Sequence, residues 1–169
     1  MTLSKRDRLD NLALALRLMM DGLEEPYEWQ EHDANCAKFA AVHRTTWQEL
    51  DRRGLVKART FDRYELTGPG WIAGLKATGR FQDPEFKKDV GRVAAALKAK
   101  VKGRSGPGFA DRTELACDTG LSEFFIYDVI DSGLLSEIFG RIGATWALED
   151  PMKNSIDVPP DFNEVILDS

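Results

Sequence analysis

The chain has 169 residues, 43% of them hydrophobic and 30% charged, which is typical of a globular protein that builds its own core. No apolar run approaches the roughly 20 residues needed to cross a bilayer, and the N-terminus lacks a secretory pattern. The two cysteines, Cys36 and Cys117, make no disulfide framework. We therefore expect a cytoplasmic protein without a membrane partner.

The net charge of −5 is unevenly distributed along the sequence. Residues 1–112 hold 21 Lys and Arg against 16 Asp and Glu, whereas residues 113–169 hold 2 against 12. The acidity therefore belongs to the C-terminal third, at a net −10, and the rest of the chain is at +5. An asymmetry of this kind indicates different partners for the two parts.

The first part of the chain predicts three helical segments and a hairpin. Residues 4–22 form an amphipathic pattern, and helical character returns over residues 33–53 before a stop at Gly54. The stretch LVKARTFDRYEL, residues 55–66, has two short strand-like runs around a polar turn. Thr67 and Pro69 then begin another helix that ends near Gly79.

A second series of elements follows directly. Apolar residues at steps of three and four predict a helix over residues 84–102. After the loop GRSGPG come a helical motif over residues 112–132, Gly133, and a hairpin-like stretch over residues 134–148. The tail after Pro151 has little periodicity, and we expect it to wrap the surface or to be partly mobile.

The two series match when the chain is shifted by 79 positions. Residues 36–56 then lie on residues 115–135 without a gap, and the segment RYELTGP lies on TWALEDP after three extra residues. The matched pairs are Ala37 with Ala116, Ala41 with Gly120, Val42 with Leu121, Trp47 with Ile126, Leu50 with Val129, and Gly54 with Gly133. We interpret this as an internal duplication, with one domain over residues 1–80 and a second, with its tail, over residues 81–169.

Each repeat has small residues where two short helices would cross, with apolar anchors beneath them, then glycine and a strand–turn–strand. This layout resembles the winged helix-turn-helix superfamily. The resemblance implies a mainly α fold with small β-hairpin wings, arranged as two tandem winged-helix domains. It does not fix the function, because winged helices serve DNA binding and protein contacts alike.

In each repeat, the second of the two short helices would be the recognition helix. In the first repeat, this helix and the hairpin after it carry the side chains expected to contact double-stranded DNA. With Trp47 and Leu50 buried, the outward face shows residues suited to base edges and phosphates. The candidate DNA-binding residues are Arg44, Thr45, Gln48, Arg52, Lys57, Arg59 and Arg63. The alternative is an ordinary solvated face, because Glu49, Asp51, Asp62 and Glu65 dilute the positive charge.

The second recognition helix is acidic and aromatic, and duplex DNA would repel it. Its outward residues would instead form a protein interface made of Glu123, Phe124, Tyr127, Asp128 and Asp131. The partner would be a basic protein or, in a homodimer, the Lys87, Lys88, Lys98, Lys100 and Lys102 helix of a second copy. The alternative is that the aromatic rings are core.

No residue pattern indicates catalysis, a cofactor or a phosphate-binding loop, so we expect no enzyme. His32, Cys36 and His43 lack a fourth ligand, so we expect no metal. The sequence thus favours a DNA-binding transcriptional regulator whose second domain contacts protein. The alternative is a scaffold that binds no DNA, similar in acidity and general plan to the segregation-and-condensation B subunit of bacterial condensin.

Overall fold

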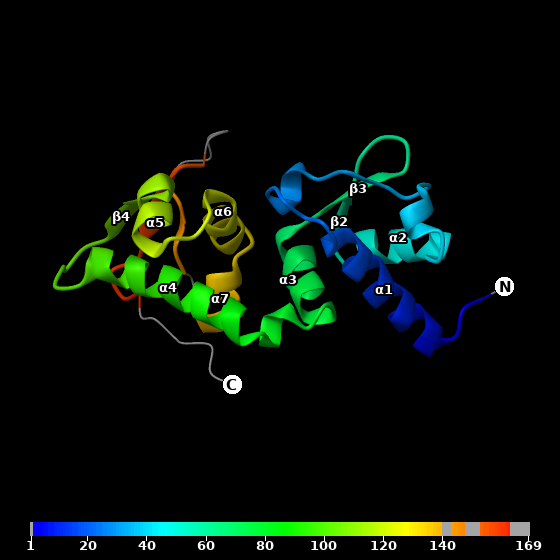
Figure 1. Ribbon diagram of the computed structural model, residues 1–169, viewed down its shortest axis with the longest axis horizontal. Coiled ribbons are helices and arrows are strands. Elements are labelled where there is room, and N and C mark those ends of the chain that lie inside the picture. The colour runs from blue at the N-terminus through cyan, green and yellow to red at the C-terminus, as the bar shows by residue number, and fades with distance from the viewer. Residues whose placement is uncertain (1, 140–142, 148–152, 163–169) are drawn as a thin grey trace. The chain divides into compact units, whose positions relative to one another are not determined.

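The computed structural model describes residues 2–139, 143–147 and 153–162. The chain divides into two compact units, Met1–Phe81 and Gln82–Ser169, where the sequence predicted a division after residue 80. The described parts are mainly helical, with two small three-stranded antiparallel sheets (Figure 1). That much of the expected fold class, mainly α with small β elements, is confirmed.

Within the described ranges, none of the helices combines the length and the apolar character that crossing a membrane requires.

The first unit begins with α1 (Lys5–Met20), whose N-cap Ser4 accepts a hydrogen bond from the Asp7 backbone N–H at 3.1 Å. Three short elements follow, namely a 3-10 helix (Tyr27–Trp29), β1 (His32–Asp33) and a second 3-10 helix (Ala37–Phe39). After them come α2 (Arg44–Arg52), β2 (Val56–Ala58), β3 (Arg63–Leu66) and α3 (Gly68–Ala77). The sheet order is β1-β3-β2. The helical character expected over residues 33–53 is therefore interrupted by β1 and by non-helical turns.

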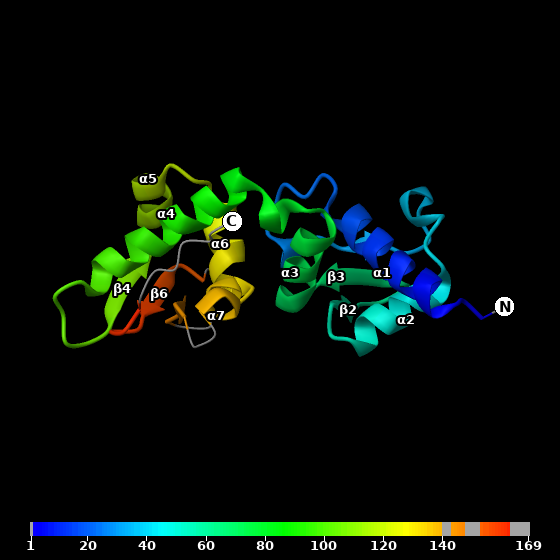
Figure 2. The ribbon, with the colours of Figure 1, turned by 90° about the horizontal axis from the view of Figure 1, so that it is seen from below.

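The core of the first unit lies between α1, α3, α2 and the sheet (Figure 2). α1 buries an i, i+3, i+4 stripe that includes Leu12, Leu16 and Met19. Gly70 on α3 is required by close packing, because a Cβ there would lie 1.7 Å from the carbonyl oxygen of Leu55. This contact fixes α3 against the start of the hairpin.

The second unit has α4 (Pro84–Val101), β4 (Gly108–Asp111), α5 (Arg112–Thr119) and α6 (Glu123–Asp131), followed by α7 (Leu134–Phe139), β5 (Thr145–Trp146) and β6 (Ser155–Val158). Its sheet has the order β4-β6-β5. In both units, therefore, the strand after the first long helix pairs with the last strand, which occupies the middle of the sheet.

Two expectations about the end of the second unit are wrong. The stretch expected to begin a hairpin at residue 134 forms α7, since Leu134 and Leu135 are adjacent and both buried, which a strand facing one core does not allow. The partner of β5 is β6, which lies in the tail that was expected to wrap the surface or to be partly mobile. Ile156 and Val158 alternate with more exposed residues and supply the buried face of β6. The match of RYELTGP with TWALEDP is wrong at its start, because RYEL is the central strand β3 whereas Thr145–Trp146 is the edge strand β5. Residues 148–151 of the matched segment lie outside the described residues.

The 79-residue shift holds for some elements and not for others. α2 and α6 are both nine residues long and begin 79 positions apart, and Gly54 and Gly133 after them both have positive φ. The helical segment that precedes α2 differs from the one that precedes α6. Ala37 is exposed in a 3-10 helix, whereas the matched Ala116 is half-buried within α5. Ala41 is exposed too, so neither residue serves as the expected small contact in a helix crossing.

Candidate nucleic-acid interface

The helix α2 is held in place by its cap and by an aromatic cluster. The Nδ1 atom of His43 accepts the Thr45 backbone N–H at 3.3 Å, and the His43 N–H donates to Asn11 Oδ1 of α1 at 2.8 Å. On the buried face, Trp47 stacks on Tyr64 of β3 at a centroid distance of 4.9 Å and meets Phe39 edge-on at 5.0 Å. These contacts join α2 to α1, to the preceding turn and to the sheet.

The opposite face of α2 is open to solvent. Arg44, Thr45, Gln48 and Arg52 are all exposed, whereas Thr46, Trp47 and Leu50 are buried. Two hollows, of about 440 and 650 Å³, flank the helix. One is shared with the start of α1, the other with residues 34–40 and β3, and Thr45 and Gln48 line both. These two residues therefore stand on a ridge between depressions.

Glu49 neutralises part of this face. Its carboxylate accepts hydrogen bonds from Arg52 Nη2 at 2.6 Å and from Arg53 Nε at 2.8 Å. The pKa of Glu49 is lowered to about 2, mainly by the hydrogen bond from Arg52 and secondly by that from Arg53. Arg44 and Gln48 make no side-chain hydrogen bond or ion pair with any residue that the structure describes. The Arg44 and Gln48 end of the ridge is therefore the part available to a ligand.

The hairpin carries three exposed cations, two of which have a carboxylate partner. Arg59 Nη2 lies 2.5 Å from Glu65 Oε1, and Arg63 Nη1 lies 3.5 Å from Glu31 Oε2. The hydrogen bond to Glu65 raises the pKa of Arg59 above its usual value. Lys57 is exposed and makes no such contact with the described residues. All seven candidate DNA-binding residues thus lie on the surface, but only part of their charge is uncompensated.

The expected interface on α6 is wrong for most of its residues. Tyr127 is 1% exposed and Asp128 is 7% exposed, so both are core. Asp131 accepts hydrogen bonds from Trp146 Nε1 at 3.0 Å and from Lys153 Nζ at 2.7 Å. Glu123 is half-buried, and Phe124, 41% exposed, is the most exposed of the five residues.

The reason for this burial is that other segments of the same unit, before and after α6, cover it. The ring of Trp146 on β5 lies 5.3 Å from that of Tyr127, and cationic groups of Arg112 and Lys153 lie over the Tyr127 ring at 5.5 and 5.3 Å. Position 127 corresponds to Gln48 of the first unit, which no such segment covers. The alternative interpretation, that these rings are core, holds for Tyr127.

The three metal-ligand candidates have separate structural situations. His32 packs edge-on to Phe39, and burial, with the charge of Lys38, lowers its pKa to about 4. Cys36 is exposed, and His43 caps α2. Within the described ranges, no group of three or more His, Cys, Asp or Glu side chains is placed to hold a metal ion.

Comparison of the chain with protein-family models, with curated proteins and with solved structures finds no match.

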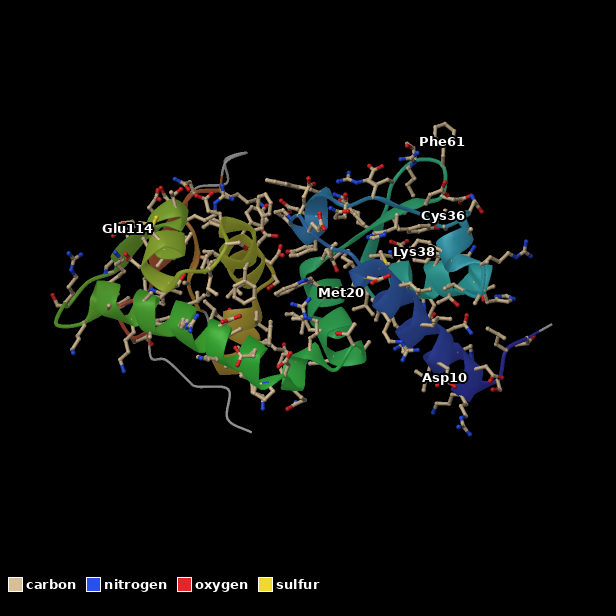
Figure 3. All side chains as sticks on the ribbon, in the orientation of Figure 1. Asp10, Met20, Cys36, Lys38, Phe61 and Glu114 are labelled. Carbon is tan, nitrogen blue, oxygen red and sulfur yellow. The ribbon has the colours of Figure 1, made fainter. Side chains whose placement is uncertain are left out.

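Sequence reasoning overlooked two residues of this surface. Glu49 was treated only as a diluting charge, although its spacing of three and four from Arg52 and Arg53 is that of helical ion pairs. Phe61 was not singled out, although a phenylalanine in the middle of a polar turn is unusual. It is 91% exposed at the end of the hairpin loop and points away from the ribbon (Figure 3).

Proposed function

We propose that the two units are tandem winged helices and that the first binds double-stranded DNA through α2 and the β2–β3 hairpin, as part of a transcriptional regulator. A partly shared order of elements supports the winged-helix assignment. Each unit has a long helix, a strand, a shorter helical segment, a nine-residue helix and two further strands, with the last strand central in the sheet; the second unit has α7 in addition, between α6 and β5. The common spacing of α2 and α6 supports a duplication.

The observation that carries the DNA-binding proposal is the open ridge of α2. A helix that enters a major groove must project beyond its surroundings and present side chains that reach base edges. The hollows on both sides of Thr45 and Gln48 give α2 that relief, and Arg44 and Gln48 are suited to bidentate contacts with guanine and adenine. The equivalent surface of α6 is filled by aromatic packing, so the proposal applies to the first unit alone.

Charge supports the same surface. Residues 38–63, which include α2 and the hairpin, hold 7 Lys and Arg against 3 Asp and Glu. The acidic residues of the first unit are concentrated before this segment, where residues 21–33 hold 6 Asp and Glu and no Lys or Arg. A duplex that approaches α2 and the hairpin therefore meets a segment with a net charge of +4, with Glu31 of the acidic segment beside Arg63.

The test is fluorescence anisotropy of a labelled duplex over a range of salt concentrations. We expect binding that weakens with salt, and Arg44→Ala and Gln48→Ala should reduce discrimination between sequences by about 1–3 kcal/mol. Lys57→Ala should weaken binding to all sequences and reduce the salt slope by about one unit. Lys102→Ala, an exposed lysine in the other unit, serves as the charge-matched control.

The scaffold alternative also has an observation in its favour. The pairing of Arg52, Arg59 and Arg63 with carboxylates is what an ordinary solvated surface does with its charges. A protein of that kind would show no affinity for duplex DNA even at low salt. The anisotropy measurement therefore separates the two functions directly.

A further inference from the structure

The tip of the β2–β3 hairpin presents an aromatic ring to solvent. Phe61 is 91% exposed, the largest exposure among the large hydrophobic residues that the structure describes as exposed. Phe61 and Asp62 have φ angles of 56° and 57°, a left-handed conformation that residues other than glycine rarely adopt. The sequence therefore holds a phenyl ring outside the protein in a backbone conformation that costs free energy, and strained residues of this kind concentrate at functional sites.

The loop that carries the ring is fixed at its base and along its side. The backbone N–H of Arg59 donates to the Arg63 carbonyl at 2.7 Å and closes the hairpin. The Asp62 carbonyl accepts the Ala34 N–H at 2.9 Å, and the Asp62 carboxylate accepts from Asn35 Nδ2 at 3.2 Å. Because residues 34–35 anchor Asp62, the neighbouring Phe61 is presented by a supported loop.

The surroundings of Phe61 indicate what it would enter. Its neighbours Arg59, Thr60, Asp62 and Arg63 are all exposed and polar, so the ring is not the centre of a wider apolar patch of the kind that protein interfaces bury. Three cations of the hairpin lie within four positions of it, at Lys57, Arg59 and Arg63. A single flat ring among cations fits a narrow apolar gap inside a polyanion, and the space between two base pairs of a duplex is such a gap.

We propose that Phe61 is a wedge that inserts between adjacent base pairs from the minor groove and kinks the duplex. The inference rests on the proposed DNA binding of the first unit. Apolar side chains used in this way partly unstack one base step, and pyrimidine–purine steps such as TpA unstack most easily. The hairpin cations hold the phosphates on either side of the step, so the ring adds bending and step preference to a contact that charge provides.

The experiment uses the full chain and a mixed-sequence duplex of about 24 base pairs with one central TpA step, its adenine replaced by fluorescent 2-aminopurine. A second duplex carries ApT at the same place. We expect wild-type protein to raise the fluorescence of the TpA probe more than that of the ApT probe. In gel electrophoresis, the mobility of the complex should depend on where the TpA step lies in the duplex, which reports a bend. Phe61→Ser should remove the fluorescence rise and the bend and weaken binding about tenfold.

Two further variants make the result specific. Phe61→Leu keeps an apolar wedge and should retain the bend, whereas Phe109→Ser, at an exposed phenylalanine on β4 of the other unit, should behave as wild type. All three variants should keep the melting temperature of the wild type, because neither Phe61 nor Phe109 is buried.

Three outcomes would overturn the wedge. If Phe61→Ser binds and bends DNA as the wild type does, Phe61 does not insert, although the proposed function stands. If Phe61→Ser changes only the mass measured by light scattering, the ring contacts protein. If the wild type has no affinity for duplex DNA at low salt, both the wedge and the proposed function fail.

Discussion

Replacing Glu49 with glutamine should strengthen DNA binding, which is the opposite of what most substitutions at a binding surface do. Glu49 holds Arg52 and Arg53 at 2.6 and 2.8 Å, and its removal frees two guanidinium groups beside the proposed contact surface of α2. Each cation that neutralises a phosphate adds about 0.9 to the slope of log K against log salt. One or two new contacts therefore raise the affinity about 8- to 60-fold at about 0.1 M salt, relative to a 1 M reference.

A substitution is necessary because pH cannot release these arginines. The pKa of Glu49 is lowered to about 2, so the charged form is favoured in the folded state and its pairing is complete above the ordinary pKa of 4.5. The pairing is lost only as the pH falls towards 2, where DNA binding is no longer measurable for other reasons. Between pH 5 and 8, titration of Glu49 should therefore cause no pH dependence of binding.

The measurement is anisotropy of one labelled duplex at several salt concentrations, with Asp51→Asn as the control. Asp51 is an exposed acid on the same helix, so its replacement changes the net charge by the same amount without freeing Arg52 or Arg53. We expect Asp51→Asn to change affinity only a few-fold and to leave the slope almost unchanged. Equal affinities and slopes for Glu49→Gln and the wild type, or for the two variants, would refute the placement of α2 against DNA.

Three further predictions concern the packing that the structure places around these surfaces. Tyr127→Ser should destabilise the second unit by about 3–5 kcal/mol in urea unfolding, because Tyr127 is 1% exposed. Phe124→Ser should cost less than half as much, since Phe124 is 41% exposed. Equal losses of stability in the two variants would contradict the assignment of Tyr127 to the core. Asp131→Ala should destabilise the second unit by about 2 kcal/mol, since it removes the acceptor of two part-buried hydrogen bonds, and an unchanged midpoint would mean that these hydrogen bonds do not form in solution. Because the pKa of His32 is lowered to about 4, its contribution to the free energy of unfolding should be complete above pH 6.5 and should decline as the pH falls towards 4. The decline is at most about 3 kcal/mol, and solvent screening of this part-buried ring reduces it. His32→Phe should flatten the decline when urea titrations at pH 7 and 4.5 are compared.

The sequence predicted those parts of the fold that depend on local periodicity. The helix expected over residues 84–102 is α4, because its buried residues recur along one face over 18 residues. The inner face of α2 was recognisable from Trp47 and Leu50, which are buried. In both cases the pattern and its consequence lie within one element, so no knowledge of distant partners was needed.

The parts that failed depend on pairings between distant residues. β6 has four residues, too few for a clear alternation, and its partner β4 lies almost 50 positions earlier, at Gly108–Asp111. The face of α6 could not be assigned for the same reason, because Tyr127 is buried by Trp146 and by Lys153, neither of which the sequence placed there. Side-chain type alone made an aromatic and acidic helix look like an interface.

The contrast between α2 and α6 explains how two helices of equal length, 79 positions apart, can present different surfaces. On α6 the carboxylate of Asp131 binds Trp146 and Lys153, so this helix face is joined to later segments of its own unit and cannot be offered to a partner without losing those bonds. At the corresponding position of α2, Arg52 pairs, among the described residues, with Glu49 on the same helix, and the Arg52 side chain is 72% exposed. Exposed pairs of this kind contribute little to folding stability, so the position of α2 does not depend on this one. A face whose charges are satisfied within the helix remains available to a ligand, whereas a face whose charges hold other segments has become core.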